Sequence, residues 1–162
     1  MALPSEVVIR ASTQMLGGAY GDVLPDNALH AIFPPISKEF AEHGGVDYAC
    51  VFIQNATHDT TLYNVRIYIK KQPDGARETK ERFQIGLDPK FGSPVQTIPN
   101  RTTAPENVVF YDAEDYASAI EIGVLPSGAL QAIWIKRIVQ PNTQPTPDTS
   151  CVLQIEFVKV SQ

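Results

Sequence analysis

The side chains that most often carry chemistry are few in this chain and far apart. The histidines are His30, His43 and His58, and none stands two or four residues from another histidine or from a cysteine. Zinc ligands supplied by one strand or one helix need that kind of spacing, so the sequence predicts no metal site. Cys50 lies in an apolar run without a nearby histidine, which argues against a base-activated nucleophile.

An acidic cluster, formed by Asp112, Glu114 and Asp115, is the remaining place for chemistry. Its spacing matches no calcium loop with the expected glycine, so a solvated turn is the simpler interpretation. A carboxylate pair for glycoside hydrolysis depends on separation in space, which the sequence does not give. Phosphate-binding loops and nucleophile elbows are missing as well. We therefore expect no catalytic residues and no cofactor, and we predict that the chain is not an enzyme.

Charge and hydropathy limit the partners. The net charge of −5 argues against general binding to nucleic acid or to anionic membranes, and no apolar run reaches the roughly 20 residues that cross a bilayer. One stretch is locally basic but carries interleaved acidic residues, so we interpret it as a solvated hairpin tip, with a phosphate-binding patch as the alternative. Its basic residues are Arg66, Lys70, Lys71, Arg77, Lys80 and Arg82.

The two cysteines bear on the environment of the chain. The first residues resemble no secretory signal, so we expect synthesis in a reducing cytosol, where thiols persist. Cys50 and Cys151 then act as buried small hydrophobes. Because they stand about a hundred residues apart in apolar runs, a disulfide across a sandwich stays open as the alternative.

Apolar periodicity predicts an all-β fold. Residues 47–54 are apolar on both faces, as in a central strand, whereas 62–71 alternate between apolar and polar side chains, as in a strand with one solvated face. Further strands are expected at 83–87, 108–111, 120–124, 130–139 and 151–160. Turn residues between most of them favour an antiparallel β-sandwich, either immunoglobulin-like or a jelly roll.

Trp134 stands near the middle of the longest predicted strand. A core anchor is the simpler role for such a ring. A platform for stacking a sugar is the alternative, and the other aromatic candidates for such a platform are Tyr63, Tyr68, Tyr111 and Tyr116.

The first part of the chain differs from the rest. Glycines and prolines interrupt residues 1–46 repeatedly, and only small apolar clusters lie between them. We expect an irregular N-terminal arm that packs on the sandwich or on a neighbouring subunit, with one helical turn at 37–43, followed by a sandwich domain at 47–162. Deleting residues 1–30 is expected to leave a folded domain that no longer binds its assembly.

The sequence resembles a group of small structural proteins of tailed bacteriophage particles. The resemblance covers about residues 16–160. The stretches that carry it are LGGAYGD, NALHAIFPPISKEFAEHGGVDYACVFIQN, TLYNVRIYIKK, FQIGLDP and LPSGALQAIWIKRIV. One departure is Ala49, at a place where the family has a basic residue, so any contact made by that residue is in doubt here.

The resemblance implies a non-enzymatic virion protein, assembled in the host cytoplasm. The first expectation is a capsid decoration or cement protein, present in many copies or as a homo-oligomer, that binds the major capsid protein or other virion proteins. The alternatives are a head–tail, neck or tail component and a carbohydrate-binding or host-adhesion module. Neither the resemblance nor the residues fix the oligomeric state, the position in the particle or the host.

Within this expectation, four apolar residues of the arm are the candidate partner-binding residues. They are Met15, Leu16, Ile32 and Phe33. Segments of this kind become ordered on binding and cover large areas of a neighbour. The alternative is that these side chains close the open end of their own sandwich.

Overall fold

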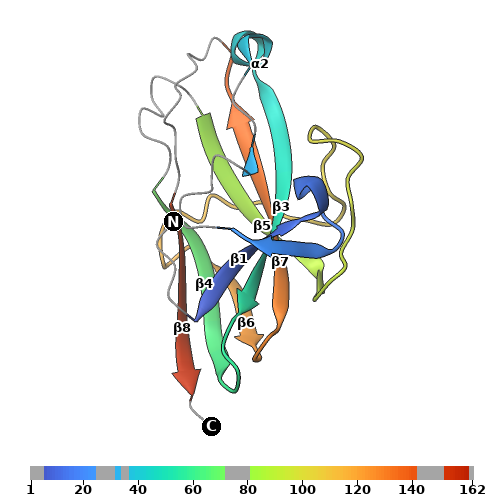
Figure 1. The fold of residues 1–162 in the computed structure, drawn as a ribbon. Coiled ribbons are helices and arrows are strands. Elements are labelled where there is room, and N and C mark those ends of the chain that lie inside the picture. Colours follow the sequence, from blue (N-terminus) through green and yellow to red (C-terminus); the bar gives the residue numbers. More distant parts are fainter. Residues whose placement is uncertain (1–5, 25–31, 34–36, 72–80, 142–151, 161–162) are drawn as a thin grey trace.

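The computed structural model describes residues 6–24, 32–33, 37–71, 81–141 and 152–160. Over these ranges the chain is an antiparallel β-sandwich, as the sequence predicts (Figure 1). Its elements are β1 (Val7–Ser12), the 3-10 helix η1 (Thr13–Met15), β2 (Tyr20–Val23), α2 (Lys38–His43), β3 (Gly45–Asn55), β4 (Thr61–Lys71), β5 (Glu81–Phe91), β6 (Ile120–Leu125), β7 (Leu130–Val139) and β8 (Val152–Val160).

The described strands form two sheets. The large sheet has the order β2-β1-β3-β7-β5, and the small sheet has the order β6-β4-β8. In the immunoglobulin fold, strands A, B, E and D form one sheet, and C and F pair in the other. Here β1, β3, β7 and β5 stand in that order and β4 pairs with β8, all antiparallel. The order of these six strands is therefore that of an immunoglobulin-like sandwich.

The main core lies between the sheets. Its side chains alternate along the strands and include Val51 and Ile133 from the large sheet and Val65 and Ile67 from the small one. This is the pattern expected for a sandwich whose inward positions are apolar. The clean alternation of residues 62–71 thus corresponds to a strand with one face in the core.

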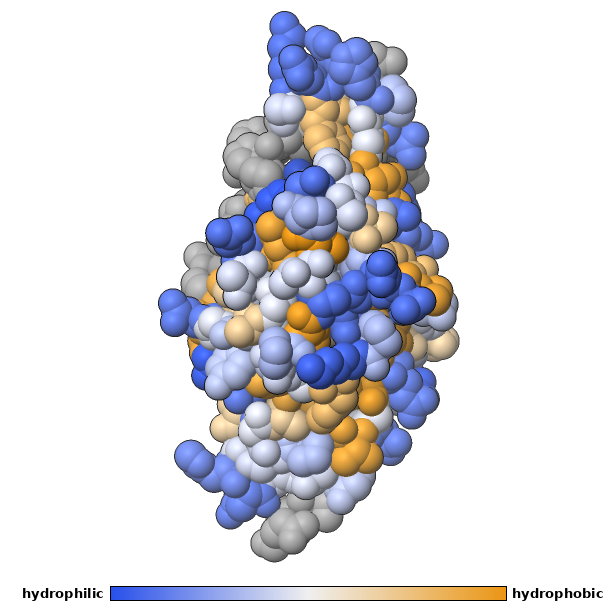
Figure 2. Space-filling view, turned by 90° about the vertical axis from the view of Figure 1, so that its right-hand side faces the viewer, coloured by the Kyte–Doolittle hydropathy of each residue, from blue (hydrophilic) through white to orange (hydrophobic). Residues whose placement is uncertain are grey.

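A second core covers the outer face of β3 and β7. Cys50, Phe52 and Trp134 are fully buried there, beneath Val95 and Ile98 from the segment that follows β5. This explains why residues 47–54 are apolar on both faces, and it confirms Trp134 as a core anchor. Figure 2 looks at this side of the molecule, where apolar residues form separate patches in a mostly hydrophilic surface.

The arm is more regular than expected. Within residues 1–46, β1 pairs with β3 and places Val7 and Ile9 in the main core, and β2 forms the edge of the large sheet. The described parts of the arm therefore belong to the sandwich. Deletion of residues 1–30 would remove β1 and its core side chains. We therefore expect the deleted protein to be destabilised, and not to remain a folded domain as the sequence alone suggested.

The remaining local expectations have mixed outcomes. The helical turn at 37–43 is confirmed as α2. Residues 108–111 form no strand, because only Tyr111 makes an isolated bridge, to Ile85. Cys50 is a free, buried thiol. Cys151, His30 and most of the predicted basic hairpin tip lie outside the described residues.

Candidate functional site

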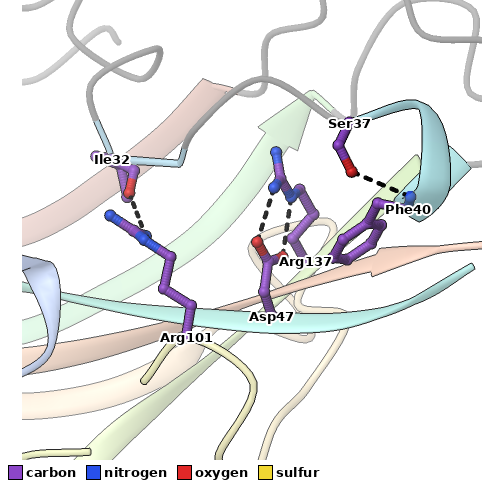
Figure 3. Close-up of polar contacts among 6 residues, drawn as sticks. All are labelled: Ile32, Ser37, Phe40, Asp47, Arg101 and Arg137. Carbon is purple, nitrogen blue, oxygen red and sulfur yellow. Dashed lines mark hydrogen bonds and ion pairs between the residues drawn. The ribbon is translucent and has the colours of Figure 1, made fainter. Parts of the chain in front are cut away.

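A buried ion pair joins the two central strands at the α2 end of the sandwich (Figure 3). Arg137 on β7 stands opposite Asp47 on β3. Its Nε donates to Asp47 Oδ1 at 2.9 Å and its Nη2 donates to Oδ2 at 2.7 Å. The side chains are only 5% and 4% exposed. Such a bidentate pair holds both groups in a fixed geometry.

Aromatic rings enclose this pair. The Arg137 guanidinium carbon lies 4.8 Å from the centre of the Phe33 ring and 5.6 Å from that of Phe40. Phe40 is placed by α2, which begins where the Ser37 hydroxyl accepts a hydrogen bond from the Phe40 backbone N–H at 3.1 Å. Gly44 ends the helix at a φ of +71°, a conformation that favours glycine. The local sequence thus fixes the position of one wall.

Arg101 reaches the same end from the segment after β5. Its Nη1 donates to the Ile32 carbonyl at 2.9 Å (Figure 3). Burial lowers the pKa of the Arg101 guanidinium, and the Asp47 carboxylate partly opposes this. The groups together hold Ile32 and Phe33 against the sandwich, so this cluster has a structural role.

The structure places the four candidate partner-binding residues inside or against the cores of their own chain. Ile32 and Phe33 are buried in the main core, which corresponds to the alternative interpretation in the sequence analysis. Met15 and Leu16 are half-buried, the first against the main core and the second against the outer core. A role for any of the four in binding a partner stays a prediction.

Asp88 organises the polar part of the outer core. Its Oδ2 accepts from Trp134 Nε1 at 2.9 Å and from Gln96 Nε2 at 3.0 Å, and its Oδ1 accepts from the Lys90 backbone N–H at 2.9 Å. The buried indole N–H therefore has a charged acceptor, as buried polar groups require. Burial, followed by the charge of Asp88, raises the pKa of the Cys50 thiol, so its reactive thiolate form is suppressed.

Each carboxylate of the acidic cluster at 112–115 contacts a different partner. Asp112 accepts from Gln84 at 3.0 Å and Glu114 pairs with Arg82, whereas the Asp115 carboxylate caps the turn at Ser118. Within the described ranges, histidine, cysteine and carboxylate side chains nowhere gather in a group of three that could hold a metal ion. The side chains of the cluster are thus engaged in local contacts.

The outer face of the small sheet carries a groove of about 720 Å³. Strand β4 contributes Asn64, Arg66 and Tyr68 to it, at alternating positions that face away from the core. Strand β8 adds Glu156, Phe157 and Val158, and Tyr116 stands at its side, on the segment before β6. Concave sites lined by aromatic and convergent polar side chains are the usual form of ligand sites.

The sequence alone indicates only part of this groove. The alternation of residues 62–71 places Asn64, Arg66 and Tyr68 on one solvated face, and Tyr68 and Tyr116 were named as possible sugar platforms. Glu156 was missed because its place opposite Arg66 depends on the pairing of β4 with β8, which no local pattern determines. The pairing of Asp47 with Arg137 was missed for the same reason.

Comparisons with protein-family models, with curated proteins and with solved structures find no match for this chain. Among the described residues, no helix is long and apolar enough to cross a bilayer.

Proposed function

We propose that this chain is a non-enzymatic structural protein of a tailed-bacteriophage particle, and specifically a decoration or cement protein that binds the major capsid protein lattice. The class of protein is supported by the sequence resemblance over about residues 16–160. The mode of action is supported by one structural observation, the exposed edge of the large sheet.

That edge is β2. All four of its residues are exposed, including Tyr20 at 48% and Val23 at 47%. Among the described strands β2 pairs only with β1, so its other side has no strand neighbour. An edge with exposed apolar side chains is a ready template for contact with another chain. It belongs to the same segment, residues 1–46, for which the sequence predicts packing on the sandwich or on a neighbouring subunit.

The residues next to β2 extend this surface. Met15 and Leu16 lie in and beside η1, just before β2, and both are half-buried. The segment after β5 reaches the same edge, because the Ser93 hydroxyl accepts a hydrogen bond from the Tyr20 backbone N–H. We define Tyr20 and Val23 as the β2 surface. A contact surface made of a few side chains suits a protein that is present in many copies on one lattice, because weak contacts add up by multivalency.

The proposal is tested by binding of the purified protein to capsids of the particle. Tyr20→Ser combined with Val23→Glu removes apolar area and adds charge at the β2 surface, and we expect capsid binding to fall about tenfold or more. Val124→Glu is the matched control, because Val124 is 50% exposed on β6 of the other sheet. Circular dichroism checks that both variants fold. Unchanged binding by the β2 variant, or loss by the control, would contradict the proposed contact surface.

A head–tail, neck or tail component is the second proposal, since the same β2 surface suits it equally. Copy number separates the two. Decoration of a capsid needs hundreds of copies per particle, whereas a neck needs around a dozen or fewer.

A further inference from the structure

The groove on the small sheet combines donors, acceptors and an aromatic wall in one place. Arg66 and Asn64 supply donors, Glu156 supplies an acceptor, and Tyr116, which is 52% exposed, forms the wall. The positions of these side chains are fixed by strand register, because Arg66 on β4 stands opposite Glu156 on β8. The groove therefore rests on rigid elements and not on a loop alone.

Arg66 shows that the groove has unused bonding capacity. Its guanidinium carbon lies 5.1 Å from the centre of the Tyr116 ring, and its Nε is buried without a hydrogen-bond partner. Its cross-strand neighbours are Glu121 on β6 and Glu156 on β8, and within the described residues neither forms an ion pair with it. A buried donor without an acceptor is costly. A ligand that supplies an oxygen to this guanidinium, with a small shift of the side chain, removes that cost.

The other polar side chains of the groove are Tyr68, Glu156 and Asn64. The Tyr68 hydroxyl lies at the Glu156 carboxylate, and burial together with this carboxylate raises the pKa of Tyr68. Asn64 stands at a bulge in β4, with a φ of +52°, where its side chain is exposed. A ligand in the groove thus meets an amide and a guanidinium on β4 and a carboxylate on the neighbouring strand β8.

The charge around the groove selects the ligand class. Carboxylates at Glu121 and Glu156 flank the single guanidinium of Arg66, and the whole chain carries a net charge of −5. This field disfavours polyanions such as acidic peptides or acidic glycans. A neutral sugar offers hydroxyls that both donate and accept, together with an apolar ring face for the tyrosine. These groups are of the kinds that the amide, guanidinium, carboxylate and tyrosine side chains of the groove bind.

We infer that the groove of Asn64, Arg66, Tyr68, Tyr116 and Glu156 binds a neutral oligosaccharide. Its volume of about 720 Å³ lies within the range of ordinary ligand sites, roughly 300–1,000 Å³. The groove and the β2 surface lie on different sheets, so that glycan binding and contact with a lattice are compatible. The inference does not depend on the proposed function.

The test is saturation-transfer NMR on the full chain with maltotetraose, cellotetraose, mannotetraose and chitotetraose at millimolar concentration. We expect at least one of these neutral sugars to bind. Tyr116→Ala and Arg66→Ala are each expected to weaken that binding about tenfold or more. Tyr111→Ala is the matched control, because Tyr111 is as exposed as Tyr116 but does not line this groove.

The same experiment also tests other possible occupants of the groove. A hyaluronan tetrasaccharide and a poly-glutamate peptide serve as anionic probes, and sedimentation of wild type and Tyr116→Ala tests for a second copy of the chain. Absence of binding by all four neutral sugars would overturn the inference. So would sugar binding that survives both groove substitutions, tighter binding of either anionic probe, or a dimer that Tyr116→Ala dissociates. None of these results bears on capsid binding through the β2 surface.

Discussion

Asp47 and Arg137 face each other across adjacent central strands and share two hydrogen bonds, of 2.9 and 2.7 Å, in a site that water barely reaches. Arg101 lies close enough for the Asp47 carboxylate to act on its pKa. One carboxylate therefore balances cationic groups from β7 and from the segment after β5. The pair fixes the register of β3 on β7 and anchors the end of the sandwich that α2 covers.

Removing one member of the pair is expected to destabilise the protein strongly. Asp47→Ala removes the bidentate carboxylate contact of the buried Arg137 guanidinium, and we expect the free energy of unfolding to fall by about 3–5 kcal/mol. The double variant Asp47→Leu with Arg137→Met replaces both charges by apolar groups, so it is expected to be more stable than Asp47→Ala. Urea unfolding of Asp47→Ala, of the component single variants Asp47→Leu and Arg137→Met, and of the double variant measures these free energies. Additive losses in the double variant would contradict a coupled pair.

Gly17 is expected to be the glycine least tolerant of a side chain. It has a φ of +99°, and a Cβ there would lie 2.0 Å from the Gln96 carbonyl oxygen. Gly92 is the matched control, since it has a φ of +92° and nothing within 4 Å of a Cβ. Both alanine variants carry backbone strain, but only Gly17→Ala adds a collision, and we expect it to cost about 1–3 kcal/mol more. Equal midpoints in thermal unfolding would show that Gly17 and the Gln96 carbonyl do not approach this closely.

Trp134 is expected to report the closed outer core. Because the ring is fully buried, its fluorescence should be blue-shifted and should not be quenched by iodide in the native state. Asp88→Ala removes the acceptor of the indole N–H, and we expect a loss of about 1–3 kcal/mol of unfolding free energy. Asp112→Ala, at an exposed carboxylate, should change stability by no more than about 0.5 kcal/mol. Strong iodide quenching of the native protein would mean that Trp134 is not a core residue.

The pKa of Asp115 is expected to depend on Ser118. Hydrogen bonds from the Ser118 hydroxyl and backbone N–H, at 2.7 and 2.8 Å, lower the pKa of this carboxyl group. A lowered pKa in the folded state means that the ionised carboxylate stabilises the fold. This stabilisation is fully present above the ordinary pKa of aspartate, and it is lost as the pH falls through the lowered pKa of the folded state. Ser118→Ala removes the hydroxyl donor and should raise the pKa of Asp115 in an NMR titration. Ser127→Ala, in a different turn, should leave it unchanged, and an equal effect of both changes would contradict this origin.

Local patterns predicted much of the fold and little of the candidate site. The alternation of residues 62–71 and the two apolar faces of 47–54 indicated β4 and β3, since each pattern reflects which faces of a strand are covered. The strand character of β1 was missed because Val7–Ser12 is short and stands among glycines and prolines; its pairing with β3 organises it. Residues 108–111 show the reverse error, because apolar side chains there cover the outer core without pairing in a sheet.

The site residues depend on contacts between distant parts of the chain. Glu156 meets Arg66, and Arg137 meets Asp47, only after β4 has paired with β8 and β3 with β7. Asn55 is another case: its buried amide donates to the carbonyls of Thr60 and Leu125, each at 2.8 Å, and so ties the turn after β3 to the end of β6. A single sequence carries the residue types for these contacts but not the register that brings them together.

The proposal that this chain decorates a phage capsid is tested most directly by its location and copy number in purified particles. Quantitative mass spectrometry of particles produced from the genome that carries this sequence, with cryo-electron microscopy of the same particles, gives both. We predict hundreds of copies per particle, with density for the sandwich on the outer capsid surface and the β2 edge toward the major capsid protein. Complete absence of the chain from mature particles would contradict the account, and about a dozen copies at a neck would replace decoration by the second proposal.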